Sequence, residues 1–188
     1  MQHYILSIMV DVVSIASYIS ERYMKEYGER IDEMKLHKLL YFTQRECLVQ
    51  KGEPIFPEVL HAWKYGPVMP EIRQLYKDDC LKKVPSEEVM GPYREVMDEV
   101  FREYAPSKPL TLVSISHAEL SWKRARKGYT KYESSDVPMK LEDIREDAEN
   151  YKGRLALLKV QRDFLNSKGI KDHEQFLWGL ARHRVPVV

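Results

Sequence analysis

Apolar residues recur at helical spacing along most of the chain, and the first such stretch follows Asp11. Aspartate is a favoured N-cap residue, because its carboxylate accepts hydrogen bonds from the free N–H groups of the first helical turn. Gly28 is of the type that ends helices. The sequence therefore predicts a helix between these two residues, with the following apolar positions on one face: Val12, Ile15, Ala16, Ile19 and Tyr23.

A second helix is predicted from Asp32 to Gly52, with Pro54 just beyond it as a stop signal. One stripe of this helix is apolar and should face a core: Leu36, Leu39, Leu40 and Cys47.

The stretch "LHAWKYGPVMPE" changes period. Its first residues alternate in the manner of a strand, in two sets: Leu60, Ala62 and Lys64 against His61, Trp63 and Tyr65. Gly66 and Pro67 predict a turn, and Pro70 followed by Glu71 fits the first turn of a helix. A candidate partner strand lies near Ile55, and so small a ribbon needs helices beneath it to be stable.

Helical patterns continue after this corner. A helix is predicted from Ser86, with these apolar positions: Tyr93, Val96, Val100 and Tyr104. Residues 105–109 predict a loop. Another helix should run from Thr111 to Gly128, and small residues recur in it at spacings of 4, 3 and 4: Ser114, Ala118, Ser121 and Ala125. They predict one small face that another backbone or an inserted side chain can approach closely.

The last part of the chain is also predicted to be helical. Residues 129–138 read as a loop, and helices are expected from about Leu141, from about Arg154 and, as a short element, from Asp172. The pattern shows no internal repeat and no linker long enough to divide domains. The chain is therefore predicted to be one mainly α domain.

Composition narrows the class of protein. The chain has 188 residues, 44% hydrophobic and 31% charged, with a net charge of +1, which does not mark the whole molecule as a nucleic-acid or membrane binder. Cys47 and Cys80 lack the spacing of a zinc site or a disulfide framework and suit a reducing cytoplasm. Residues 1–10 are interpreted as a strand or packed helical lead-in, since they lack a basic n-region and are too short to span a bilayer. We expect no metal and no cofactor.

His117, Glu119 and Ser121 raise the possibility of a hydrolase. A continuous helix would place His117 and Ser121 on one face, within reach of a hydrogen bond. However, Ser121 lacks the strand-to-helix elbow and the glycine-rich oxyanion loop that acyl transfer requires. A histidine that anchors a neighbouring loop is the preferred interpretation.

Charge is unevenly distributed toward the C-terminus. Residues 123–127 with Lys131 contribute five basic charges, whereas residues 133–149 carry seven acids against two bases. The basic cluster follows a helix, where positive charge is favoured. A solvated helix end is the first interpretation, and DNA binding by an autorepressor is a weaker alternative.

Four aromatic residues remain open between core packing and an interface: Trp63, Tyr65, Tyr76 and Trp122. The prolines and glycine around Trp63 and Tyr65 would lower the ordering cost of binding, which favours a recognition corner.

Three ordered motifs resemble the Panacea domain, the family of SocA-like and phage-associated (GepA-like) proteins, many of them antitoxins. Its pattern is a K-L-x-K-L-L-Y-x-x-Q helix with a G-x-P-l-F connection, an A-W-x-x-G-P-V-x-P corner and an L-s-x-x-s-H-x-x-x-x-W helix. The first motif is matched by Lys35, Leu36, Lys38, Leu39, Leu40, Tyr41 and Gln44, followed by Gly52, Pro54 and Phe56. The later motifs are matched by Ala62, Trp63, Gly66, Pro67, Val68 and Pro70, and by Leu112, Ser116, His117 and Trp122. The chain departs from the pattern at Ser121, where the family commonly has proline, and at Arg45-Glu46.

The resemblance implies a compact single-domain helical fold with a small two- or three-stranded β-element. It covers roughly residues 11–151, after the lead-in at 1–10, and leaves 152–188 as a helical extension expected to pack on the same domain. It also implies a non-enzymatic, cytoplasmic antitoxin of a type II toxin–antitoxin system. Such a protein binds its cognate toxin or acts as an adapter that delivers the toxin to a protease.

The expected partner-binding set combines the corner with nearby motif residues: Trp63, Tyr65, Gly66, Pro67, Val68, Pro70, His117, Trp122, Lys38 and Gln44. The helix faces around Arg45, or around Ser114 and Ala118, should add contact area. An enzyme that uses His117 as general acid or base, and a DNA-binding autorepressor, remain the alternatives.

Overall fold

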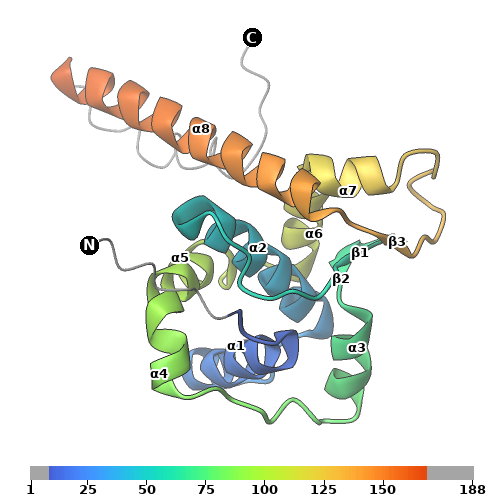
Figure 1. Cartoon of the computed structure of the whole chain (residues 1–188). Coiled ribbons are helices and arrows are strands. Elements are labelled where there is room, and N and C mark those ends of the chain that lie inside the picture. The colour runs from blue at the N-terminus through green and yellow to red at the C-terminus, as the bar shows by residue number, and fades with distance from the viewer. Residues whose placement is uncertain (1–8, 169–188) are drawn as a thin grey trace, which may run out of the picture.

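The computed structural model describes residues 9–168, and helices form most of this part of the chain (Figure 1). The helices are α1 (Val12–Tyr27), α2 (Glu33–Lys51), α3 (Pro70–Lys77), α4 (Glu87–Met90), the 3-10 helix η1 (Gly91–Tyr93), α5 (Arg94–Tyr104), α6 (Pro109–Ala118), α7 (Leu120–Ala125) and α8 (Leu141–Ser167). A small sheet is formed by β1 (His61–Trp63), β2 (Gly66–Val68) and β3 (Val137–Pro138). The prediction of a mainly α fold with a small β-element is confirmed.

The first two helices begin and end where the sequence predicted. The carboxylates of Asp11 and Asp32 each accept a hydrogen bond from a first-turn backbone N–H, and Gly28 and Gly52 adopt left-handed backbone conformations at the C-termini. Residues 1–8 of the expected lead-in lie outside the described residues, but the N–H of Val10 donates to the carbonyl of Ile55 over 2.8 Å.

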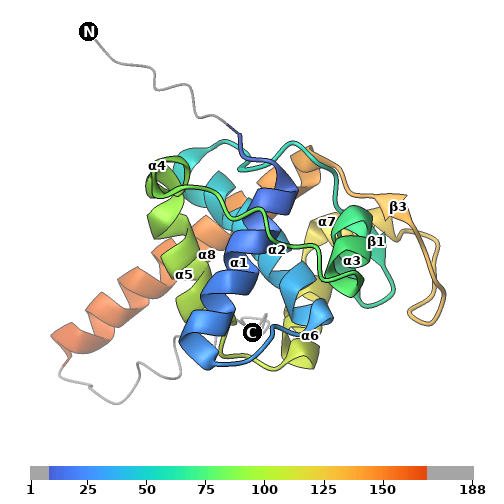
Figure 2. The same ribbon diagram turned by 90° about the horizontal axis from the view of Figure 1, so that it is seen from below.

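Helix α2 lies at the centre of the fold. It contacts α1, α3, α5, α6, α8 and β2, and Figure 2 shows α1 lying across it from below. Consequently every residue from Lys35 to Leu48 is buried, including polar residues that lie off the predicted apolar stripe. A helix surrounded on all sides must provide a partner for each polar group it buries, because an unpaired buried group is costly.

The sheet differs from the predicted ribbon. Its strand order is β2-β1-β3, and β1 pairs antiparallel with both neighbours. Gly66 and Pro67 therefore lie in a strand opposite Trp63 and Ala62, and the tight turn falls at Lys64 and Tyr65. The predicted turn at Gly66-Pro67 is wrong by two residues.

The predicted partner strand near Ile55 is also wrong. Among the described residues, 55–57 form no strand, and the outer partner of β1 is β3, at the end of the segment predicted to be a loop. No local pattern marks Val137 and Pro138 as a strand, because their pairing is with a segment more than 70 residues away.

The helix predicted from Ser86 is broken into α4, η1 and α5, although its apolar positions are buried as expected. The next helix begins at Pro109 rather than at Thr111. Proline suits the first helical position, because its missing N–H would have no partner there in any case.

The predicted helix from Thr111 to Gly128 is interrupted at Glu119, which is extended with φ −74° and ψ 149°. A tertiary capping arrangement accounts for the break. The carboxylate of Asp147 in α8 accepts the backbone N–H groups of Leu120 (2.7 Å) and Ser121 (2.9 Å), while Glu119 pairs with Arg45 over 3.1 Å. The prediction of one continuous small face is therefore wrong, because Ser114 and Ala118 lie in α6 whereas Ser121 and Ala125 lie in α7.

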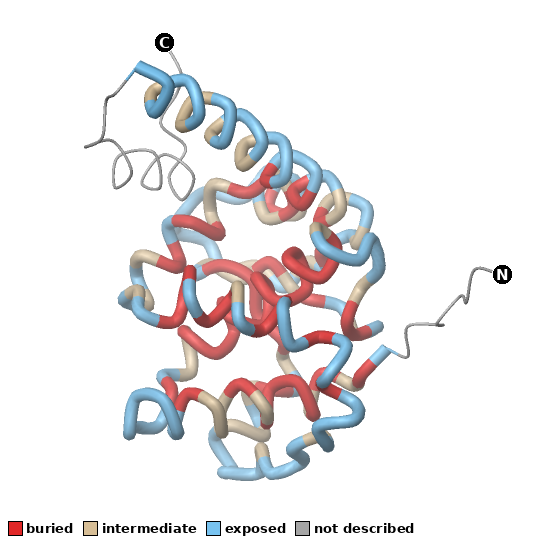
Figure 3. The backbone as a smooth tube through the Cα atoms, turned by 90° about the vertical axis from the view of Figure 1, so that its left-hand side faces the viewer, coloured by how far each residue is buried: buried red, intermediate tan, exposed pale blue. Residues whose placement is uncertain are grey.

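Helix α8 is one element where the sequence predicted two. It continues through Arg154, and all of its buried residues lie in its first eleven positions: Ile144, Asp147, Ala148 and Tyr151. From residue 152 onward it is exposed or half-buried and extends past the body of the molecule (Figure 3). The short helix expected from Asp172 lies outside the described residues.

Candidate functional site

A cavity of about 520 Å³ opens beside the β1–β2 turn, at the N-terminal end of α2. Its apolar walls come from α2, β1, the turn and β2, in the form of Met34, Trp63, Tyr65 and Val68. This volume lies in the range of ligand pockets, roughly 300–1,000 Å³. The cavity brings together four of the predicted site residues, since Lys38 also lines it.

The two aromatic rings of the corner are accessible to different degrees. Tyr65 is 54% exposed, and Trp63 is half-buried. The indole N–H of Trp63 donates to Asp136 over 2.7 Å, and the guanidinium of Arg73 lies 5.0 Å from its ring centroid. Asp136 also bonds the ring of His61 at 2.7 Å. The corner therefore presents one fixed ring and one exposed ring, neither sealed in the interior.

Lys38 fixes the backbone of the corner from inside. Its side chain is almost fully buried, and Nζ donates to the carbonyl of Pro67 over 3.0 Å. Burial lowers the pKa of Lys38 to about 7, against the opposing influence of the charge on Asp32. The hydrogen bond couples the K-L-x-K and G-P motif segments of the chain to each other.

Gly66 is required by this close approach. Its φ is +98°, and a Cβ there would lie 2.6 Å from Cε of Lys38 and 2.7 Å from Oγ of Ser116. Any other residue would be strained and would force the side chains of Lys38 and Ser116 to shift.

His37 was not among the predicted site residues, yet it lines the same cavity. Its Nδ1 accepts the backbone N–H of Met69 over 3.3 Å, and burial lowers its pKa to about 3, with the charges of Lys38 and Arg73 acting in the same direction. The neutral ring therefore carries its proton on Nε2. This buried atom has no hydrogen-bond partner among the described residues, and the nearest carboxylate oxygen, on Glu33, is 4.0 Å away.

His117 and Trp122 support the corner from behind. Their rings stack at 3.8 Å, and the indole N–H of Trp122 donates to the carbonyl of Trp63 over 3.0 Å. Burial, aided by the charges of Lys38 and Arg126, lowers the pKa of His117 to about 4. This placement agrees with the interpretation of His117 as an anchor.

The expected proximity of His117 and Ser121 on one helix face is wrong, because the two residues lie in different helices, on either side of Glu119. The hydroxyl of Ser121 instead lies 3.4 Å from that of Tyr41, in a buried network with Asp147.

Two other predicted site residues have structural placements. Gln44 is buried and clamps the connection after α2, donating to the carbonyl of Phe56 and accepting from the N–H of Ile55. Pro70 occupies the first turn of α3. Neither residue lines the cavity.

The arginines of the basic cluster are used within the fold. Arg124 bonds Asp143 at 2.8 Å and Glu146 at 3.0 Å, and Arg126 donates to the carbonyls of Thr130 and Glu133. The acidic segment thus neutralises part of the basic cluster, which supports the structural interpretation of both.

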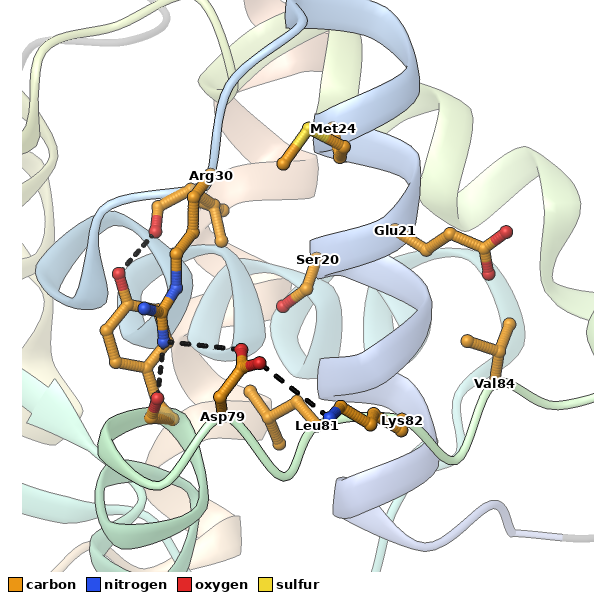
Figure 4. Close-up of a pocket in the computed structure, with 10 residues that line it drawn as sticks. Ser20, Glu21, Met24, Arg30, Asp79, Leu81, Lys82 and Val84 are labelled. Atoms are coloured by element: carbon orange, nitrogen blue, oxygen red, sulfur yellow. Dashed lines mark hydrogen bonds and ion pairs between the residues drawn. The ribbon is translucent and has the colours of Figure 1, made fainter.

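A second cavity, of about 420 Å³, lies between α1 and the segment after α3 (Figure 4). Its charged residues have ion-pair partners, since Arg30 and Lys82 both lie within ion-pair distance of Asp79 and Glu21 pairs with Lys25. None of the residues predicted to bind a partner lines it.

Residues 9–168 contain no cluster of three or more histidine, cysteine or acidic side chains that could hold a metal ion. None of the helices described for them is long and apolar enough to cross a bilayer.

The fold and the site define a class: a small, mainly helical domain whose three-stranded sheet presents an aromatic-walled cavity. Residues 36–123 match the family model described as "Antitoxin SocA-like, Panacea domain". A stretch of 46 residues is 41% identical to Antitoxin SocA of Caulobacter vibrioides (strain NA1000 / CB15N) and covers 24% of each chain. No solved structure matches the chain. Residues 36–123 therefore belong to the SocA-like Panacea domain family.

The sequence missed several residues that line the cavity or hold its wall: His37, Arg73, Ser134, Ser135 and Asp136. His37 is adjacent to a motif lysine, which is a usable signal. Ser135 and Asp136 reach the corner only because β3 pairs with β1, and no local pattern indicates this.

Proposed function

We propose that this protein is an antitoxin that binds a protein toxin through the cavity and the β1–β2 turn. The observation that carries the proposal is the exposed Tyr65 beside the half-buried Trp63 at a cavity, within a region that belongs to an antitoxin-like family. Tyrosine and tryptophan are enriched among the residues that dominate interface energies.

The corner is rigid before any partner arrives. Trp63 is held by Asp136 through its side chain and by Trp122 through its carbonyl, and Lys38 holds Pro67. A site ordered in advance loses less conformational entropy on binding. The hydrogen bonds that hold these residues in the fold therefore also order the surface for binding.

The interface extends beyond the corner, because a specific complex buries about 800 Å² per partner. The loop before β3 offers neighbouring area through exposed Tyr129 and Tyr132. We assign the binding module to residues 11–151, with 152–188 as an extension of the same domain, and place the protein in the cytoplasm as part of a type II toxin–antitoxin system.

Neutralisation proceeds by a non-enzymatic protein–protein contact. Two modes are compatible with such a surface: covering the active surface of the toxin, or holding the toxin for delivery to a protease. The two modes differ in toxin lifetime, since only delivery shortens the half-life of the toxin in cells that express both proteins.

The test is co-expression with the product of the adjacent gene, followed by co-purification and a growth assay. Tyr65→Ala should weaken binding by about 2 kcal/mol, roughly 30-fold, while stability changes by less than about 0.5 kcal/mol. Leu110→Ala is the matched control, because Leu110 is an exposed apolar residue of α6 that does not line the cavity. Unchanged affinity of Tyr65→Ala would remove the corner from the interface, and failure to protect cells from any neighbouring gene product would contradict the antitoxin role.

A further inference from the structure

The lining of the cavity beside Tyr65 combines apolar and aromatic side chains with the hydrogen-bond donors of His37 and Lys38 and with two carboxylates, Asp32 and Glu33. We propose that it receives a carboxylate side chain, an Asp or a Glu, from the segment of toxin that the corner binds. This inference rests on the proposed function and specifies the chemistry of the partner.

Lys38 is the first donor. Its ammonium group has three N–H bonds, of which one is used by the carbonyl of Pro67. No carboxylate among residues 9–168 lies within ion-pair distance of Nζ, so an incoming carboxylate meets N–H donors without an acceptor and would favour the charged form of Lys38. A carboxylate seated there would form a charge-assisted hydrogen bond in a water-poor site.

His37 is the second donor. Its Nε2–H lies in the buried part of the same lining and has no acceptor among the described residues. A buried donor without an acceptor is costly, and a ligand oxygen at this position would remove that cost.

The rim adds cations whose charges are only partly used. Lys64 has no carboxylate partner within the described chain, and its Nζ lies 5.3 Å from the ring centroid of Tyr65. Arg73 forms an ion pair with Glu33, in which Nε lies 3.1 Å from the carboxylate. Asp32, the other acid of the lining, accepts the N–H of Lys35 at the start of α2. Both lining carboxylates thus have internal partners, and the free groups are donors.

The walls favour a side chain over a phosphate backbone. Met34, Trp63 and Val68 offer apolar surface for the methylene groups of an acidic residue, and a phosphodiester has no comparable apolar stem. A nucleic acid is therefore the less suitable anion, and a single-stranded oligonucleotide serves as a comparison in the test.

The experiment uses phenylpropionate and its uncharged isostere phenylpropionamide as probes on the isotope-labelled full chain. The indole N–H resonance of Trp63, assigned with Trp63→Phe, reports binding. We expect the acid to shift this resonance with a dissociation constant on the order of 1 mM. The amide should bind at least tenfold more weakly. Lys64→Gln should weaken binding of the acid severalfold, whereas Lys123→Gln, outside the lining, should leave it unchanged.

Saturating phenylpropionate should also weaken the complex with the co-purified toxin, and the amide should not. Three results would each overturn the inference: equal binding of acid and amide, stronger binding of the oligonucleotide at the same resonance, or a toxin complex that the acid does not weaken. None of them would contradict toxin binding by the β1–β2 turn. A chain that binds the acid but no toxin would overturn the proposed function itself.

Discussion

Two of the three buried lysine and arginine residues of α2, Arg45 and Lys38, have opposite surroundings. Arg45 is fully buried and closed in by its partners: Nη1 lies 3.1 Å from Glu119, Nη2 donates to the hydroxyl of Tyr104 over 2.5 Å, and the guanidinium covers the ring of Tyr151 at 4.0 Å. Lys38, two turns earlier, has one backbone carbonyl and borders a cavity.

One end of α2 thus contributes to stability, and the other end is suited to binding. Burial lowers the pKa of Arg45, but Tyr104, followed by Glu119 and the neighbouring tyrosines, outweighs this effect and raises the pKa above its ordinary value, so the charge is permanent. Burial without a carboxylate partner lowers the pKa of Lys38 to about 7. At the Arg45 end the buried charge is paired with Glu119 within the core. At the Lys38 end some N–H donors have no acceptor among the described residues, and a binding site needs such donors.

The largest loss of stability is expected from a substitution at the Arg45 end of α2. Arg45→Met should lower the free energy of unfolding by about 3–5 kcal/mol, because it leaves Glu119 buried without its main cation. Urea denaturation measures the change. Arg124→Gln is the control, since its ion pairs are on the surface and should be worth less than about 1 kcal/mol. A loss below 1 kcal/mol for Arg45→Met would mean that the buried pair does not hold this end together.

The Lys38 end of α2 can be tested by a substitution at Gly66, in the backbone segment that Lys38 holds through Pro67. Gly66→Ala should cost about 2–4 kcal/mol, since it combines strain at positive φ with a clash against Lys38 and Ser116. Gly28→Ala is a matched control, because its φ is +72° but nothing lies within 4 Å of the added Cβ. Thermal unfolding of both variants separates the clash from the strain, and equal losses would show that the close approach is unimportant.

Acidification should lower the free energy of unfolding by a smaller amount, through His37. The folded-state pKa of His37 is about 3, below its ordinary value of 6.5, so between these values the unfolded chain binds the proton and the folded chain does not. Stability that is present above pH 6.5 is therefore lost as the pH falls. From pH 7 to pH 5, His37 should contribute a loss of about 2 kcal/mol.

His37→Asn isolates this contribution, because the side-chain oxygen of asparagine can replace Nδ1 as acceptor of the N–H of Met69 but asparagine does not titrate. Denaturation curves of the variant should depend less steeply on pH than those of the natural chain, with His117 supplying part of the remaining slope, since its pKa is about 4. Identical slopes would show that His37 is not buried as a neutral ring.

Sequence patterns predicted the elements whose signals are local. Asp11, Asp32, Gly28 and Gly52 mark helix ends with their own chemistry, and the structure uses each of them in that way. The motif resemblance also selected Lys38, Trp63 and Val68, which share the cavity, although it did not indicate that a cavity exists.

The errors arose where distant residues override local preference. The sequence from Thr111 to Gly128 is compatible with one helix, and the break at Glu119 depends on Arg45 and Asp147 from other elements. Ser121, the second residue of α7, occupies the position where the family commonly has proline, a residue tolerated in a first turn. The proline that the family has at this position indicates a helix start, and it was the signal that could have predicted the beginning of α7.

Neighbouring residues alone indicated a mainly helical chain with an aromatic, proline-held corner and a resemblance to the Panacea domain over part of its length, because capping, periodicity and motif order are local features. Only the tertiary structure decided that α2 is enclosed on every side, that Asp136 holds Trp63 across the sheet, and that His37 and Lys38 face a cavity. The physical reason is that burial and the pairing of polar groups depend on what surrounds a residue, and here the surroundings come from segments far away in the chain.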